Sequence, residues 1–394
     1  MEKRMGRETS TSLELPEELI EEILYYLPAK NLLKLKRVSK SWNSLISSKS
    51  FIKEHAKKSN TDRNLDRNKL MLNYDDSRKR AKYMRVSCQP GILVSCPIQN
   101  FLLNDDPVAT ALDSHRMKKC GYDIRIEDVR ILGSCNGLIL ISVNDWRYLF
   151  LWNPFTRKMR NIPHAASFTR SEFSSVQPFT YSLGYDEYAD DYKVVCIISD
   201  YAKPYHTHIY SSKNNTWKKI ESFDKGYLLH KNSGKFVNGK LHWLAAQDDG
   251  VYEIFSLDLR KEKCEIVARP ESFSKYVRPF FRNMGGYLGL ITLNSSVDDI
   301  SVWVMLKYGV RESWTKIWTF SYLEYSKTEI CCGASPLCLK KNGDIIIVFE
   351  NKVVVYNGRN GLRKFRFDML DGVIDSVVYV ETLVSPFGDE ELGQ

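Results

Sequence analysis

Residues 134–163, SCNGLILISVNDWRYLFLWNPFTRKMRNIP, contain the pattern that decides the fold of most of this chain. An Asn136-Gly137 turn leads into the apolar strand 138–141, and a later strand has an aromatic and basic signal around Trp152. Short β-branched and aromatic runs that are bounded by Gly, Asn and Pro turns are typical of antiparallel strands. We therefore expect this stretch to be β structure.

The pattern recurs along the chain, with matching points that are 58, 47, 46 and 53 residues apart: Trp152, Tyr210, Leu257, Trp303 and Tyr356. A period near 45–50 residues, with about four strands per unit, is typical of a β-propeller blade. Strands within 70–86 and 376–384 are expected to combine into a further blade and to close the ring. The sequence thus predicts an all-β propeller with six blades. Seven blades, or an array of β-sandwiches, are the structural alternatives.

The N-terminal region has helical periodicity instead. Pro16 and four glutamates suit the first turns of a helix, and Leu19, Ile20, Ile23, Leu24 and Leu27 give it an apolar stripe. Shorter helices are expected at 31–37 and after Ser39, which is a good N-cap. A module of this size cannot bury all its leucines by itself, so they either pack on the rest of the chain or dock a partner.

Changes in composition divide the chain into five parts. A small all-α module precedes a large all-β domain, so the expected class is α+β and multidomain. The predicted ranges are an N-terminal tail (1–12), a helical module (13–58), a polar linker (59–69), the propeller (70–386) and a C-terminal tail (387–394).

The net charge of +9 is unevenly distributed, with +8 before residue 91 and +1 after it. The large domain is therefore electrically balanced, which argues against a nucleic-acid binder, because phosphate neutralisation needs clustered positive charge. No apolar run approaches the length of a membrane helix, and the polar start predicts no secretory signal. The nine cysteines are irregularly spaced and are expected to be reduced thiols. The expected location is therefore the cytoplasm, the nucleus or both.

Residues 15–55, LPEELIEEILYYLPAKNLLKLKRVSKSWNSLISSKSFIKEH, resemble an F-box throughout their length. The later domain resembles the F-box-associated, kelch-like domain of a large plant family. That second resemblance is carried by SCNGL (134–138), LWNPFT (151–156), GYD (184–186), DYKVV (191–195), Trp217 and NGKLHW (238–243). True kelch repeats have paired glycines in each blade, whereas this chain has one such pair, Gly285-Gly286, so it resembles the associated-domain variant.

The resemblance implies a substrate-recognition subunit of a Skp–cullin–F-box ubiquitin ligase. The F-box would bind a Skp-type adaptor, and through it a cullin and a RING protein, while the propeller would bind a protein target. Basic charge near the F-box would suit an acidic partner surface. On this hypothesis there are no catalytic residues, no metal and no cofactor, and the partners include neither nucleic acid nor a membrane. The residues expected to form or support the adaptor contact are Leu15, Pro16, Leu19, Ile20, Ile23, Leu24, Leu27, Pro28, Leu32, Leu33, Val38 and Trp42. The alternatives are a regulatory binding protein outside a ligase, or a propeller enzyme such as a glycosidase.

Several motifs allow a sharper chemical interpretation, and each has a simpler structural one that we favour. Ser134 or Cys135 between glycines looks like a nucleophile, but the sequence supplies no base. His206 and His208 share a strand face, yet two ligands do not make a metal site. The acidic residues 186–191 are more typical of a hairpin turn than of a hydrolase pair, and the basic run 78–82 of a loop than of a nuclear signal. The recurring tryptophans are expected to pack between blades.

Overall fold

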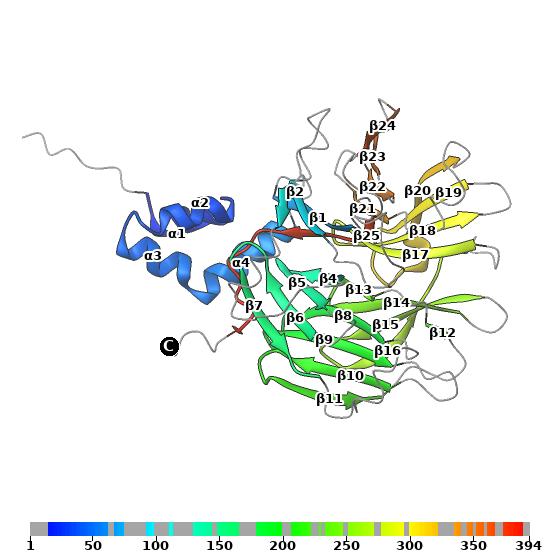
Figure 1. Ribbon diagram of the computed structural model, residues 1–394, viewed down its shortest axis with the longest axis horizontal. Coiled ribbons are helices and arrows are strands. Elements are labelled where there is room, and N and C mark those ends of the chain that lie inside the picture. Colours follow the sequence, from blue (N-terminus) through cyan, green and yellow to red (C-terminus); the bar gives the residue numbers. More distant parts are fainter. Residues whose placement is uncertain are drawn as a thin grey trace, which may run out of the picture.

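The computed structural model describes two regions of different secondary structure, four helices followed by strands (Figure 1). The residues described are 15–61, 67–74, 92–97, 110–112, 129–143, 148–164, 179–198, 206–221, 228–229, 233–246, 251–271, 277–294, 299–321, 335–339, 345–349, 352–357, 361–366 and 373–388. The basic run 78–82 lies outside them.

The helices are α1 (Glu17–Tyr25), α2 (Ala29–Leu35), α3 (Lys40–Ser47) and α4 (Lys49–Asn60). Pro16 and Pro28 occupy the N-cap positions of α1 and α2, and Ser39 Oγ accepts a hydrogen bond from Trp42 N as the cap of α3. The second helix begins at Ala29, two residues before the predicted start, because Pro28 (φ −57°) already sets the backbone for it.

The described strands form six antiparallel sheets. The second sheet in chain order contains β4 to β7 (Arg130–Cys135, Leu138–Val143, Tyr148–Asn153, Lys158–Ile162), and the third contains β8 to β11 (Phe179–Asp186, Asp191–Ile198, His206–Ser211, Thr216–Ile220). The fourth contains β12 to β16 (Leu228–Leu229, Lys235–Val237, Lys240–Ala246, Tyr252–Asp258, Lys263–Val267). The fifth contains β17 to β20 (Val277–Met284, Tyr287–Asn294, Asp299–Met305, Trp314–Ser321), and the sixth contains β21 to β24 (Ser335–Leu339, Ile345–Phe349, Lys352–Asn357, Gly361–Arg366).

The remaining sheet joins the two ends of the domain. It contains β1 (Asn68–Tyr74), β2 (Ile92–Pro97), β3 (Thr110–Leu112) and the last strand, β25 (Val373–Val380), which pairs with β1. The inner strands β25, β4, β8, β13, β17 and β21 each contact the next, and β21 contacts β25, so the described strands close a ring. The propeller class is confirmed, as is the pairing of the C-terminal strand with the strand near residue 70. The number of blades stays a prediction.

Two turn types repeat around the ring. Three sheets join their first two long strands through two-residue turns with positive φ, at 136–137, 238–239 and 285–286, which is the geometry that Asn-Gly and Gly-Gly pairs favour in hairpins. Three sheets join their last two strands through a turn that begins at Asn153, Ser211 or Asp258, each of which accepts a backbone hydrogen bond. The residue four positions later has positive φ in each case.

Candidate functional site

An apolar face of the first helix is exposed. Leu19 and Ile23 lie one turn apart on α1 and have 52% and 53% of their surface exposed, and Leu15, which precedes the N-cap, is 56% exposed and extends this row. Tyr26 just after the helix is 60% exposed. Rows of large apolar side chains are normally buried, so this row marks a contact surface.

The other predicted adaptor-contact residues fall into three groups. Leu33 and Val38 are exposed (44% and 62%), as are the two helix-starting prolines, 16 and 28. Leu24 and Leu32 are fully buried and form the core of the helical module with Ile46 and Phe51. The residues packed at the edge of that core, and partly buried, are Ile20, Leu27 and Trp42. The structure therefore separates supporting residues from those available for contact.

The module is fixed to the propeller through its last helix. Lys57 Nζ lies 2.9 Å from Glu187 Oε1, Lys53 Nζ 3.3 Å from Asp190 Oδ1, and Asn60 Nδ2 donates to Asn136 Oδ1 at 2.5 Å. All three propeller groups lie in turns that join the first two strands of their sheets. Helix α4 therefore lies on the face of the ring that carries these turns.

The C-terminal segment returns to the helices and completes their core (Figure 1). Leu383 is buried in the same cluster as Leu24, and Phe155 from the β6–β7 turn packs beside it. Asn153 Nδ2 donates to the carbonyl oxygens of Thr382 (3.0 Å) and Val384 (2.7 Å). No sequence pattern predicts this contact. Asn153 in the Asn-Pro motif was a usable signal, but only as a turn residue.

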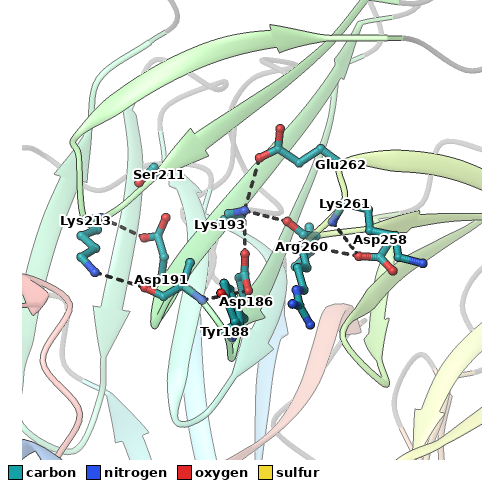
Figure 2. Close-up of polar contacts among 12 residues, drawn as sticks. Asp186, Tyr188, Asp191, Lys193, Ser211, Lys213, Asp258, Arg260, Lys261 and Glu262 are labelled. Carbon is teal, nitrogen blue, oxygen red and sulfur yellow. Dashed lines mark hydrogen bonds and ion pairs between the residues drawn. The ribbon is translucent and has the colours of Figure 1, made fainter.

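The acidic turn after β8 contains a dense polar cluster (Figure 2). Asp186 accepts hydrogen bonds from the backbone N–H groups of Tyr188 and Ala189, and Lys193 Nζ lies 2.9 Å from its Oδ2. Lys193 Nζ also donates to the carbonyl oxygen of Leu259 at 2.6 Å and lies 3.3 Å from Glu262 Oε1. These last two groups belong to the neighbouring sheet, so Lys193 connects two sheets.

The contacts of this cluster also determine the pKa of Asp186. Burial raises the pKa of Asp186, but the hydrogen bonds from Lys193 and the turn N–H groups outweigh this effect and hold the pKa below its ordinary value. Asp191 is 4% exposed and accepts from Ser212 Oγ and Lys213 N. A hydrolase needs one carboxyl with a raised pKa beside an ionised one. Asp186, whose pKa is lowered, does not supply the member with a raised pKa.

The other chemical candidates are also occupied or buried. Ser134 Oγ donates to the carbonyl oxygen of Val378 at 2.6 Å, and burial raises the pKa of the Cys135 thiol well above its ordinary value. His206 and His208 lie on β10, and the described residues contain no group of three or more His, Cys, Asp or Glu side chains that could hold a metal ion. Within the described ranges, no helix is long and apolar enough to span a membrane.

The tryptophans mostly pack as expected. Trp152, Trp243 and Trp314 are buried, whereas Trp217 and Trp303 are partly buried. The indole N–H of Trp217 donates to the carbonyl oxygen of Pro163 at 2.5 Å, and that of Trp314 donates to the carbonyl oxygen of Ala268 at 2.8 Å. Each acceptor follows the outer strand of the preceding sheet, so two blades are attached by the same contact.

Two family models match the chain. Residues 12–54 match the F-box domain, and residues 96–386 match the F-box associated beta propeller domain, which covers well over half of the sequence. The chain belongs to the plant F-box proteins with an F-box-associated propeller. Helices α1 to α3 and the first half of α4 therefore lie in the F-box, and we call the module α1–α4 the F-box below.

Relatives with the same organisation occur in Arabidopsis thaliana. F-box/kelch-repeat protein At3g23880 is 29% identical over 390 residues, covering 96% of this chain and 98% of the relative. F-box protein CPR1 is 28% identical over 351 residues, covering 79% of this chain and 77% of the relative. The match to At3g23880 includes both the F-box and the propeller, so the two regions occur together in that relative.

Proposed function

We propose that this F-box protein is the substrate-recognition subunit of a Skp–cullin–F-box ubiquitin ligase. The F-box docks on a Skp-type adaptor, which connects it to a cullin and a RING protein, and the propeller holds a protein target for ubiquitination. The subunit performs no chemistry, and it acts by holding the target close to a partner's thioester. It needs neither a cofactor nor a metal for this role.

The observation that carries the proposal is the exposed row Leu15, Leu19 and Ile23. Helix α4, at the other end of the module, provides the ion pairs to the propeller, and Leu24 faces the F-box core. The row is therefore left available for a partner, as are Leu33 and Val38 in the same module. Apolar anchors that are desolvated at the centre of an interface each contribute about 2 kcal/mol or more.

The F-box contact also determines where a target can bind. Since α4 lies on the ring face that carries the turns at Asn136 and Glu187, a target is expected on the face that the F-box leaves open. The chain's three described free thiols, Cys135, Cys196 and Cys264, fit a reducing compartment, which supports the cytoplasm or nucleus as the place of action.

The test is binding of the full-length protein to a purified Skp-type adaptor. Replacing both Leu19 and Ile23 by alanine is expected to weaken binding at least about 100-fold, since two anchors are lost. The matched control replaces Ile266 and Leu306, which are similarly exposed (59% and 55%) but lie on the propeller, and it is expected to bind like the unchanged protein. All four positions are exposed, so folding is expected to be preserved.

The ligase proposal fails if the unchanged protein binds no Skp-type adaptor, or if the F-box pair of substitutions binds as well as the propeller pair. A protein that binds the adaptor but never assembles with a cullin would instead support the alternative of a regulatory binding protein.

A further inference from the structure

The most exposed of the described large apolar side chains lies in the turn after β8. Tyr188 has 77% of its surface exposed. Arg260, from the β15–β16 turn of the neighbouring sheet, stacks on it, with the central guanidinium carbon 4.0 Å from the ring centroid (Figure 2). A single exposed apolar residue is ordinary on a protein surface, but tyrosine and arginine together are two of the residue types enriched at the energetic centres of interfaces.

The pair lines an open groove of about 470 Å³ between the third and fourth sheets. The other lining residues are Tyr185, Asp186, Glu187, Asn238, Gly239 and Asp258. The groove lies beside the F-box, because Glu187 pairs with Lys57 of α4. A chain segment can therefore enter it from the solvent without displacing any part of the protein.

The charge of the groove is unmatched at one residue. Arg260 is the single cation in the lining, and its guanidinium has no carboxylate partner among the described residues. The carboxylates of the lining each have a cation of their own: the pairs are Asp186–Lys193 (2.9 Å), Glu187–Lys57 (2.9 Å) and Asp258–Lys240 (3.9 Å). The groove therefore offers a positive charge to a partner while its negative charges are paired within the protein.

The two turns that carry the pair are connected before any partner binds. Tyr188 N donates to Asp186 Oδ1 at 3.1 Å. Lys193 Nζ lies 2.9 Å from Asp186 Oδ2 and donates at 2.6 Å to the carbonyl oxygen of Leu259, the residue before Arg260. Stacking holds the plane of the guanidinium and leaves its N–H edge available for hydrogen bonds. A contact that is arranged in advance loses less conformational freedom on binding.

We propose that Tyr188 and Arg260 form a docking patch for an extended, acidic segment of a protein partner. A carboxylate of the segment faces the Arg260 guanidinium, which can bind both carboxylate oxygens at once. An adjoining part of the segment lies over the exposed tyrosine ring. This patch is separate from the adaptor-binding row on α1 and from the open ring face on which the body of a target is expected.

The test is fluorescence anisotropy of a short labelled peptide in which glutamate alternates with glycine, titrated with the full-length protein. We expect saturable binding with a Kd below about 1 mM, weakened as the salt concentration is raised. The matching peptide with glutamine in place of glutamate is expected to bind about tenfold more weakly or less, because glutamine keeps the shape but not the charge. A matching phosphoserine peptide that binds while the glutamate peptide does not would overturn the assignment of a carboxylate.

Substitutions locate the site. Arg260→Gln is expected to weaken binding of the glutamate peptide about tenfold or more, since it removes a charged hydrogen-bond donor, and Tyr188→Ala is expected to weaken it by a smaller factor. Arg311→Gln is the matched control, because the Arg311 side chain is 50% exposed, lies outside the groove and has Glu271 3.8 Å away. All three side chains are exposed, so folding is expected to be preserved.

The proposal is overturned if the glutamate peptide does not bind, if the glutamine peptide binds equally well, or if Arg260→Gln binds the glutamate peptide like Arg311→Gln. The titration contains no adaptor, so each of these failures leaves the ligase proposal standing.

Discussion

His242 shows how a single side chain links neighbouring sheets. It lies on β14 and is fully buried. Nδ1 is 3.1 Å from the carbonyl oxygen of Lys235, which only accepts, so Nδ1 carries the proton and Nε2 accepts from Tyr308 OH at 2.7 Å. Tyr308 belongs to the β19–β20 connection of the next sheet. The neutral imidazole therefore supplies one hydrogen bond to its own sheet and one to the next.

This arrangement makes the stability of the fold depend on pH. Burial, with a contribution from the charge of Lys240, lowers the pKa of His242 from 6.5 to about 4. The stability it contributes is fully present above pH 6.5 and is lost as the pH falls through about 4, because the unfolded chain binds the proton first. The shift corresponds to about 3 kcal/mol at most. Urea unfolding at pH 7.5 and pH 4.5 measures this loss.

His242→Gln is the informative variant, since glutamine can donate and accept but does not titrate. It is expected to be less stable at pH 7.5 and to lose less stability on acidification. Burial also lowers the pKa values of His55 and His208, so part of the acid sensitivity is expected to remain. An equal loss in both proteins would show that His242 is not responsible.

At the scale of residues, the sequence predicted the apolar positions of α1 but not which of them are exposed and which are buried. The apolar positions of α1 include neighbouring pairs, Leu19-Ile20 and Ile23-Leu24, so the stripe is wider than one contact. In each pair, the first residue is exposed and the second packs in the F-box core. Which residue of each pair is buried depends on where the other helices and Leu383 lie, and helical periodicity alone does not predict those positions.

At the scale of elements, the C-terminal segment 381–388 contacts both domains. Thr382 Oγ1 donates to the carbonyl oxygen of Asn136, Asn153 holds two carbonyl oxygens of the segment, and Leu383 fills the F-box core. Gly137 is needed beside it, because a Cβ there would lie 2.2 Å from Thr382 Oγ1. The segment therefore follows a path that both domains define.

Leu383→Ala is expected to cost about 2–3 kcal/mol of stability and to weaken adaptor binding, because it loosens the core beneath the α1 row. Leu290→Ala provides the matched control, since Leu290 is a buried leucine (0% exposed) in a cluster that contains propeller residues alone. It is expected to destabilise the protein without weakening adaptor binding under native conditions. Chemical denaturation and adaptor titration measure the two effects. Equal effects of both variants on the adaptor would contradict this role of the segment.

Strand and turn elements were more predictable than the segments between them. The turn predicted at Asn136-Gly137 is confirmed, and the Asn-Gly and Gly-Gly pairs at 238–239 and 285–286 form the same turn, because only residues that tolerate positive φ fit there. The first blade was harder, since β2 and β3 fall in a region of weak pattern and β25 joins from the far end of the chain. The contact of Lys193 with the adjacent sheet was also missed, because ring closure decides which turns are neighbours.

The whole molecule is expected to unfold as one unit. Two clusters contain residues of both domains: Leu24 and Phe51 pack with Leu383, and Ala56 packs with Val384 and Leu151. Since neither domain can unfold without exposing part of the other's core, calorimetry is expected to show a single transition. Two separate transitions, with adaptor binding lost at the first, would contradict this shared core.

The pairing of β25 with β1 delays completion of the fold until β25 has been synthesised. The F-box is synthesised well before Leu383, which completes its core. A chain that is stopped early lacks both the closing strand and the residue that supports the α1 row. Only a chain that includes Leu383 therefore supports the α1 row from below as the folded protein does.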